Sequence, residues 1–141
     1  MTMTISTFLF SNHTYAADNN SVQSMLPAYT AIQEALTKDD LALAKTEAQK
    51  LEKMSAKWKD PELLKVKASL SVFTKETKIA DARGEFKKLS APFVAWMEKN
   101  KNAAYEVYYC PMAKAKWVQK KGSVINPYYG QEMLQCGEKV L

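Results

Sequence analysis

The chain has 141 residues, of which 47% are hydrophobic and 25% charged, proportions ordinary for one globular domain. Its net charge of +5 comes almost wholly from lysines spread among acidic residues, and Arg83 is the only arginine. Nucleic-acid recognition usually draws on clustered positive charge and on the arginine fork, so this pattern argues against nucleic acid as a partner.

The first 17 residues differ from the rest of the chain. A short apolar run at residues 5–10 is followed by Ala16 and Ala17 and then by polar residues 18–21. This order is typical of the end of a secretory signal peptide, although no lysine or arginine precedes the apolar run. We therefore expect residues 1–17 to be a partial signal peptide and residues 18–141 a single periplasmic domain with no membrane span. The alternative is an N-terminal tail with no role in export.

Four segments carry apolar residues at helical spacing, namely residues 24–36, 40–57, 61–74 and 79–96. Thr37 or Asp39 is expected to cap the second helix, and Asp60 the third, with Pro61 in the favoured first position. The break between the third and fourth segments is weak, and Pro92 should kink the fourth helix or mark a new start. The Leu and aromatic stripes are those of bundle helices facing a core.

The pattern changes after Asn100, and residues 99–102 are expected to be a linker. Residues 103–109 are aromatic and β-branched, so they form either an extended segment or a last helical turn. Asn126 and Pro127 suit a helix entry and Gly137 a helix end, which predicts a short helix from residue 128 or 131 to residue 136. The predicted fold class is all-α: a four-helix-type bundle with an irregular C-terminal cap and a short last helix.

The only two cysteines, Cys110 and Cys136, each have a methionine nearby, Met112 and Met133. On a helix, the spacing of Met133 and Cys136 would place both side chains on one face. Thiolates and thioethers suit Cu(I), and by the same logic Ag(I). Zinc normally takes cysteine and histidine, and the only histidine, His13, falls in the predicted signal peptide. These four sulfur residues are therefore a candidate soft-metal site, provided that the two cysteines meet in space.

A disulfide is the competing interpretation. Exported proteins with two cysteines usually form one, and spacing and compartment alone favour it over a metal. A Cys110–Cys136 bridge would close a loop of about 25 residues and stabilise the fold by roughly 3 kcal/mol. The chain would then have no metal cofactor, and the methionines would be packing residues. The same pair could also be a disulfide when oxidised and a Cu(I) site when reduced.

No enzymatic activity is predicted. The sequence has no Cys-x-x-Cys motif, no histidine to serve a cysteine nucleophile in the expected mature chain, and no paired carboxylates.

Several motifs carry a resemblance to a known family. They are residues 82–90, Tyr-Cys-Pro-Met-Ala at 109–113, Trp117, and Ile-Asn-Pro-Tyr-Tyr-Gly-Gln-Glu-Met-Leu-Gln-Cys-Gly at 125–137. Through them residues 22–141 resemble an uncharacterised helical domain of bacterial envelopes. That domain occurs alone or joined to periplasmic adaptor (membrane-fusion) subunits of copper/silver efflux systems.

The resemblance implies a periplasmic helical bundle linked to heavy-metal handling. It makes Cys110, Met112, Met133 and Cys136 the implied ligands, and it moves the balance from the disulfide to the metal. The residues that it implies as supports of these ligands are Arg83, Trp117, Asn126 and Tyr129.

The expected function is binding of Cu(I) or Ag(I) in the periplasm, for buffering or for delivery to an efflux adaptor. Because the sequence carries no adaptor or pump segment, a carrier or accessory protein is expected. The alternative is a non-catalytic envelope interaction domain that a Cys110–Cys136 disulfide staples together. Its contact with another envelope protein would lie around Trp117 and Tyr128.

Overall fold

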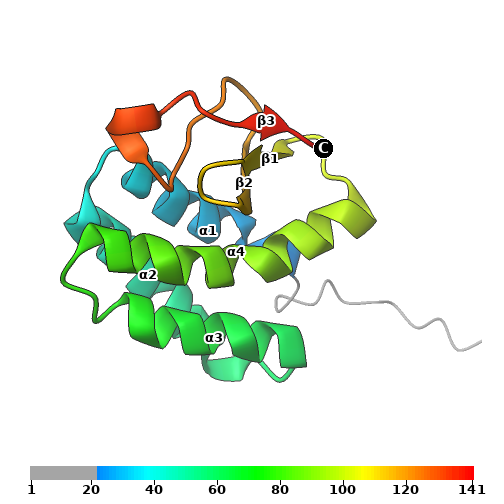
Figure 1. Cartoon of the computed structure of the whole chain (residues 1–141). Helices are drawn as coiled ribbons and strands as arrows, with labels where there is room; N and C mark the ends of the chain where they lie inside the picture. The colour runs from blue at the N-terminus through cyan, green and yellow to red at the C-terminus, as the bar shows by residue number, and fades with distance from the viewer. Residues whose placement is uncertain (1–21) are drawn as a thin grey trace, which may run out of the picture.

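The computed structural model describes residues 22–141, so the predicted signal peptide lies outside the described residues. The elements in chain order are α1 (Val22–Thr37), α2 (Leu41–Met54), the 3-10 helix η1 (Ser55–Lys57), α3 (Pro61–Phe73), α4 (Ile79–Asn100), β1 (Tyr105–Cys110), β2 (Ala115–Lys120), the 3-10 helix η2 (Gly130–Met133) and β3 (Glu138–Lys139). In Figure 1 the strands and η2 lie on one side of α1 and α4, and α3 lies on the opposite side of α4. None of the helices in residues 22–141 is both long and apolar enough to cross a membrane.

Aspartate side chains begin two of the helices. The Asp60 carboxylate accepts hydrogen bonds from the backbone N–H groups of Glu62 and Leu63, at 2.9 and 3.2 Å, at the start of α3. Such a cap satisfies amide groups that have no partner within the helix. Asp40, rather than the predicted Thr37 or Asp39, caps α2 by accepting from Leu43 N at 2.8 Å. Asp39 is thereby free for another role.

The fourth helix is continuous. It passes through Pro92 without a new start and ends before Lys101, whose φ of 45° is left-handed and stops the helix. Its buried face packs against α1, where the ring of Tyr29 stacks on Phe86 and Phe93 with centroid distances of 5.3 and 4.3 Å. The contact between α1 and α4 is thus the aromatic centre of the core.

The prediction of an all-α fold is wrong, because the C-terminal region forms a three-stranded antiparallel sheet. β1 and β2 are a hairpin in which Tyr105 pairs with Lys120 and Cys110 with Ala115. β3 adds to the other edge of β1, giving the order β2-β1-β3. The aromatic and β-branched residues of β1 favour the extended form, and its backbone hydrogen bonds go to both neighbouring strands.

The predicted short last helix is also corrected. Only Gly130–Met133 is helical, as a 3-10 turn of four residues, and Cys136 lies beyond it in a turn closed by a 3.0 Å bond from Cys136 N to Met133 O. The argument that an α-helix places Met133 and Cys136 on one face therefore does not hold.

The sheet is fixed to the helices by buried polar groups. The N–H of Val118, on the outer edge of β2, donates to the Tyr29 hydroxyl at 3.2 Å, and that hydroxyl shares a 2.8 Å hydrogen bond with Ser90 on α4. Gln33 of α1 donates to the carbonyl of Ile125 at 2.9 Å. Helices and sheet consequently share one core.

Candidate functional site

Cys110 is the last residue of β1 and is fully buried. Its Sγ accepts a hydrogen bond from the backbone N–H of Ala113 at 3.3 Å, across the turn that leads into β2. Lys114 completes this turn with a left-handed φ of 51°. The hairpin geometry therefore fixes the direction of the first sulfur.

Cys136 is half-buried and lies between η2 and β3. Its carbonyl accepts a 2.7 Å hydrogen bond from the Asn126 side-chain amide, and Asn126 itself is fully buried. The Asn126 backbone N–H also donates to Leu134 O at 2.7 Å. One buried asparagine thus holds both sides of the loop that carries the second sulfur.

The structure brings the two cysteines together. Burial raises the pKa of the Cys136 thiol, and the nearby Cys110 raises it further. Both are free thiols. They are 26 positions apart in the sequence (136 − 110) and meet because β3 returns along β1.

The two methionines have different surroundings. Met112, at the tip of the β1–β2 turn, is 62% exposed and borders a cavity of about 350 Å³ between α4 and residues 128–132. Met133 ends η2 and is half-buried. Met112 can therefore be reached from solvent directly, whereas Met133 is partly covered.

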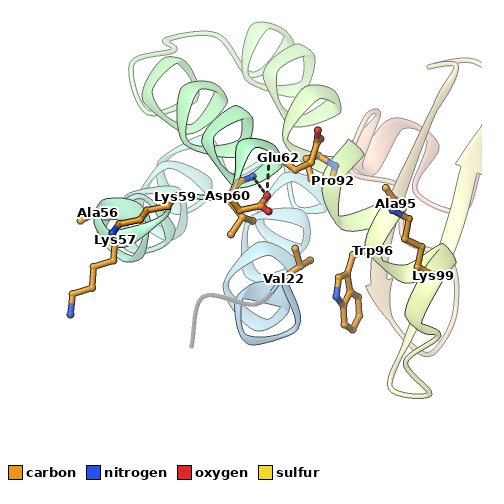
Figure 2. A pocket seen from close by; sticks show the side chains of 11 residues that line it. Val22, Ala56, Lys57, Lys59, Asp60, Glu62, Pro92, Ala95, Trp96 and Lys99 are labelled. Carbon is orange, nitrogen blue, oxygen red and sulfur yellow. Dashed lines mark hydrogen bonds between the residues drawn. The ribbon is translucent and has the colours of Figure 1, made fainter. Parts of the chain in front are cut away.

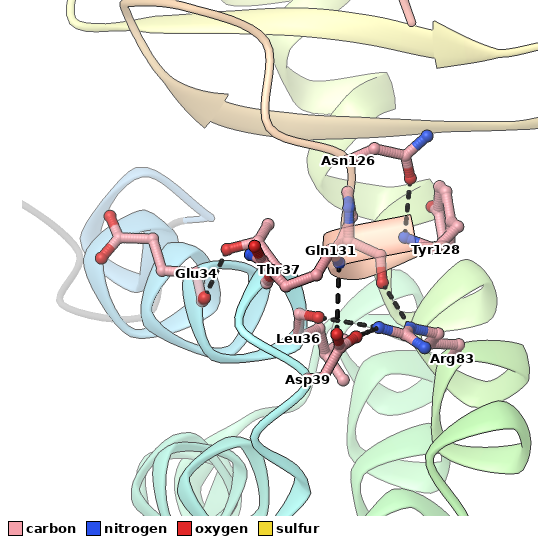
Figure 3. A network of polar contacts seen from close by, with 9 residues as sticks. Glu34, Leu36, Thr37, Asp39, Arg83, Asn126, Tyr128 and Gln131 are labelled. Atoms are coloured by element: carbon pink, nitrogen blue, oxygen red, sulfur yellow. Dashed lines mark hydrogen bonds and ion pairs between the residues drawn. The ribbon is translucent and has the colours of Figure 1, made fainter. Parts of the chain in front are cut away.

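Arg83 joins three segments, as Figure 3 shows. Its guanidinium donates to the carbonyl of Pro127 at 2.8 Å, to the carbonyl of Leu36 at 2.9 Å and to the Asp39 carboxylate at 2.5 Å. The other Asp39 oxygen accepts from Gln131 N at 3.2 Å. The residue that the resemblance implied as a support thus ties residues 127–131 to the helices.

Trp117, also implied as a support, is fully buried against the same loop. Its ring stacks on Tyr108 at 5.6 Å and meets Tyr128 edge-on at 5.9 Å. Its Nε1–H donates to the Gln119 side chain at 3.0 Å. A Cβ placed on Gly137 would lie 2.6 Å from the ring, so only glycine lets the chain after Cys136 pass this close.

Tyr129, the fourth implied support, is half-buried and borders the cavity beside Met112. Asp39 was predicted only as a helix cap and Gln119 was not predicted at all, yet both hold this region, through Arg83 and Trp117 respectively. The sequence did contain a signal for Asp39: it is adjacent to Asp40, and a helix needs only one of the two as its cap.

Within residues 22–141 no group of three or more histidine, cysteine, aspartate or glutamate residues is placed to hold a metal ion. The site is therefore a pair of thiols with methionines close by in sequence. Its reactive groups are the two thiols, one at the start of the hairpin turn and the other in the loop that ends at Gly137.

The fold and site define a helical domain that ends in a small sheet carrying a cysteine pair. The chain belongs to the family described as "Protein of unknown function (DUF3347)", whose model matches residues 25–104. The matched part covers α1 from Met25 onward and all of α2, α3 and α4, and it ends before β1, so the cysteine segment lies outside it. The search of curated proteins and the search of solved structures each found no match.

Proposed function

We propose that this protein binds a soft monovalent metal ion, Cu(I) or Ag(I), through Cys110 and Cys136. Its role is to buffer the ion in the periplasm or to deliver it to the adaptor of an efflux system. The observation that carries the proposal is the pairing of β3 with β1, in which Tyr109 lies opposite Glu138, because it brings Cys136 near Cys110. Soft thiolate and thioether ligands select Cu(I) over harder ions, and the described chain contains no histidine to favour zinc.

The environment of the pair suits reversible binding. Cys110 is buried and held by the Ala113 amide, whereas Cys136 is partly exposed. Because the pKa of Cys136 is raised, metal binding must displace a proton from this thiol, and affinity falls as the pH is lowered. The buried Cys110 would keep hold of the metal ion while a sulfur ligand of a partner protein displaces the accessible Cys136.

The methionines complete the proposed ligand set. Met112 follows Cys110 in the hairpin turn, and Met133 is joined to Cys136 by the turn hydrogen bond of 3.0 Å. A thioether is a weaker ligand than a thiolate, so either methionine serves as a third, exchangeable donor.

The same strand pairing supports a second function, an interaction domain stapled by a Cys110–Cys136 disulfide. A bridge needs the two cysteines on neighbouring segments, and the pairing of β3 with β1 places them so. In that state the bridge would tie the end of β1 to the loop before β3, and the metal site would be absent.

The test is a Cu(I) titration of the reduced full-length chain against a chromophoric chelator. The Cys110→Ser/Cys136→Ser double variant should lose competition with the chelator. Met112→Leu and Met133→Leu should weaken binding by about tenfold for a true ligand, which corresponds to roughly 1.4 kcal/mol. Met54→Leu is the matched control, because Met54 is an exposed methionine on α2, away from the cysteines.

The outcomes separate the two functions. Stoichiometric binding that is lost in the double variant supports the metal site. A wild-type chain that does not compete, and whose cysteines resist mild reductant in thiol counting, contradicts it and favours the staple. Equal affinity in all three Met→Leu variants would remove the methionines from the ligand set while keeping the cysteines.

A further inference from the structure

A second site lies on the other side of the core, in a groove of about 1150 Å³ between the start of α1, the α2–α3 connection and α4. Its floor is apolar and includes Val22, Leu63, Pro92 and Trp96. Val22 and Trp96 are only partly buried. Among residues 22–141 no segment covers this apolar surface completely.

The rim of the groove is basic. Figure 2 shows Lys57 and Lys99 at opposite ends, with Val22, Pro92 and Trp96 between them. A third lysine, Lys59, also borders the groove. Within residues 22–141 none of these three lysines forms an ion pair.

The two acidic residues of the rim are already engaged. Asp60 accepts from the first backbone amides of α3, and Glu62 pairs with Lys65 at 2.7 Å. The lining residues carry three positive and two negative charges, and Lys65 offsets the charge of Glu62. The net charge at this site is therefore positive, and an occupant is expected to offer negative charge at its edges.

We propose that this groove binds an acidic amphipathic helix of a partner protein, with apolar residues on the floor and carboxylates against Lys57, Lys59 and Lys99. Helices form the walls, and their backbone N–H and C=O groups are bonded internally. They offer no open strand edge, so the occupant must satisfy its own backbone hydrogen bonds, as a helix does. Because lysines lie at both ends of the groove, they can pair with several carboxylates spaced along a helix, whereas a fatty acid offers only one carboxylate.

The inference does not depend on the cysteine pair. A groove on one side and a thiol pair on another would let a partner hold the protein while the metal site stays accessible. The proposed metal function can fail while the groove still binds, and the reverse also holds.

The test uses a helical, tryptophan-free peptide of about 15 residues, long enough for a stable helix, with a leucine stripe flanked by glutamates. Trp96 is the reporter, because Trp58 and Trp117 are buried. Titration of the full chain should shift the Trp96 fluorescence saturably. The same peptide with lysine in place of glutamate should bind about tenfold more weakly or worse, given three lysines on the rim.

Two matched pairs of variants locate the site. Lys57→Glu/Lys59→Glu/Lys99→Glu should weaken peptide binding at least about tenfold, whereas Lys38→Glu/Lys67→Glu/Lys121→Glu, with the same change of net charge outside the groove, should not. Ala95→Glu places bulk and negative charge on the exposed rim and should also weaken binding. Ala91→Glu, one turn earlier on α4 and not bordering the groove, should leave affinity unchanged. Circular dichroism checks that each variant is folded.

Three results would overturn the proposal. The groove triple variant could bind the acidic peptide as the wild type does. Laurate, but neither peptide, could shift the Trp96 signal, which would indicate an acyl ligand. The signal could instead follow protein concentration alone, with a dimer in light scattering, which would make a second copy the occupant.

Discussion

Gly130 adopts a left-handed φ of 57° where the loop after β2 meets the helices. A Cβ at this position would overlap the Asp39 carboxylate and the Arg83 guanidinium. Gly130→Ala should therefore lower the free energy of unfolding by about 2 kcal/mol or more, through the backbone penalty and the displaced ion pair. Denaturant unfolding measures the difference.

Gly84→Ala is the matched control for that substitution. Gly84 lies within α4, and a Cβ there would meet no atom within 4 Å. Because alanine favours helix over glycine, this variant should gain about 0.5–1 kcal/mol. Equal effects of the two substitutions would contradict the role assigned to the loop network.

Asn126 links the loop geometry to the second thiol. Asn126→Ala leaves the Cys136 carbonyl and the N–H of Tyr128 without their side-chain partners, which bond at 2.7 and 2.8 Å. Each unsatisfied buried group costs about 1–3 kcal/mol. We expect lower stability and faster alkylation of the Cys136 thiol, measured in a Cys110→Ser background. Asn102→Ala, at a surface turn, should leave the alkylation rate unchanged.

At the level of elements, β3 is two residues long, and a side-chain ion pair reinforces its backbone pairing with β1. Lys139 Nζ lies 2.6 Å from Glu106 Oε1, and the other carboxylate oxygen accepts from Tyr108 OH at 3.2 Å and Gly122 N at 3.4 Å. The Lys139 hydrogen bond, which is the largest influence, holds the pKa of Glu106 below its usual 4.5. The protonation of Glu106 is therefore coupled to the side-chain contact between β1 and β3.

This pKa shift sets a direction for acid unfolding. The unfolded chain holds the Glu106 proton more tightly than the folded chain does. The contribution of Glu106 to the free energy of unfolding is therefore complete above a pH of about 4.5, and it is lost as the pH falls through the lower pKa of the folded state. Glu106→Gln should lose this part of the pH dependence, which unfolding series at stepped pH would reveal. Glu98→Gln removes an exposed pair with Lys116 and should change the profile little. Parallel profiles for the wild type and Glu106→Gln would refute the assignment.

The elements also show what the sequence could predict. Helices were predictable because their signals are local: periodic apolar residues within each segment, and the Asp60-Pro61 start. The sheet was not, because a six-residue strand such as β1 is too short for its period to be distinguished from a helical turn. Its pairing with β3 depends on residues about 30 positions away, which no local pattern contains.

The candidate site was predictable only in part. Its residue types could be read from the chain, since Cys110 and Cys136 are the only thiols and each has a methionine nearby. The two cysteines lie near each other because β3 returns along β1. Their spacing in the sequence could not predict this, so the metal site was predicted only on the condition that the cysteines meet. The proposed helical alignment of Met133 with Cys136 failed because η2 ends at Met133.

At the scale of the whole molecule, the helices and the sheet should unfold together, even though the matched family region ends at residue 104. The Tyr29 hydroxyl joins α1, α4 and β2, and full burial raises its pKa, so it stays neutral. Far-UV circular dichroism follows the helices, and alkylation of buried Cys110 in a Cys136→Ser background follows the sheet. Both probes should give one denaturant midpoint. Tyr29→Phe leaves the Val118 N–H unsatisfied and should lower both midpoints together, by about 1–3 kcal/mol in stability. If the Cys110 probe alone shifted, the sheet would be a separate unit, and binding at the cysteines would have no means of stabilising the helices.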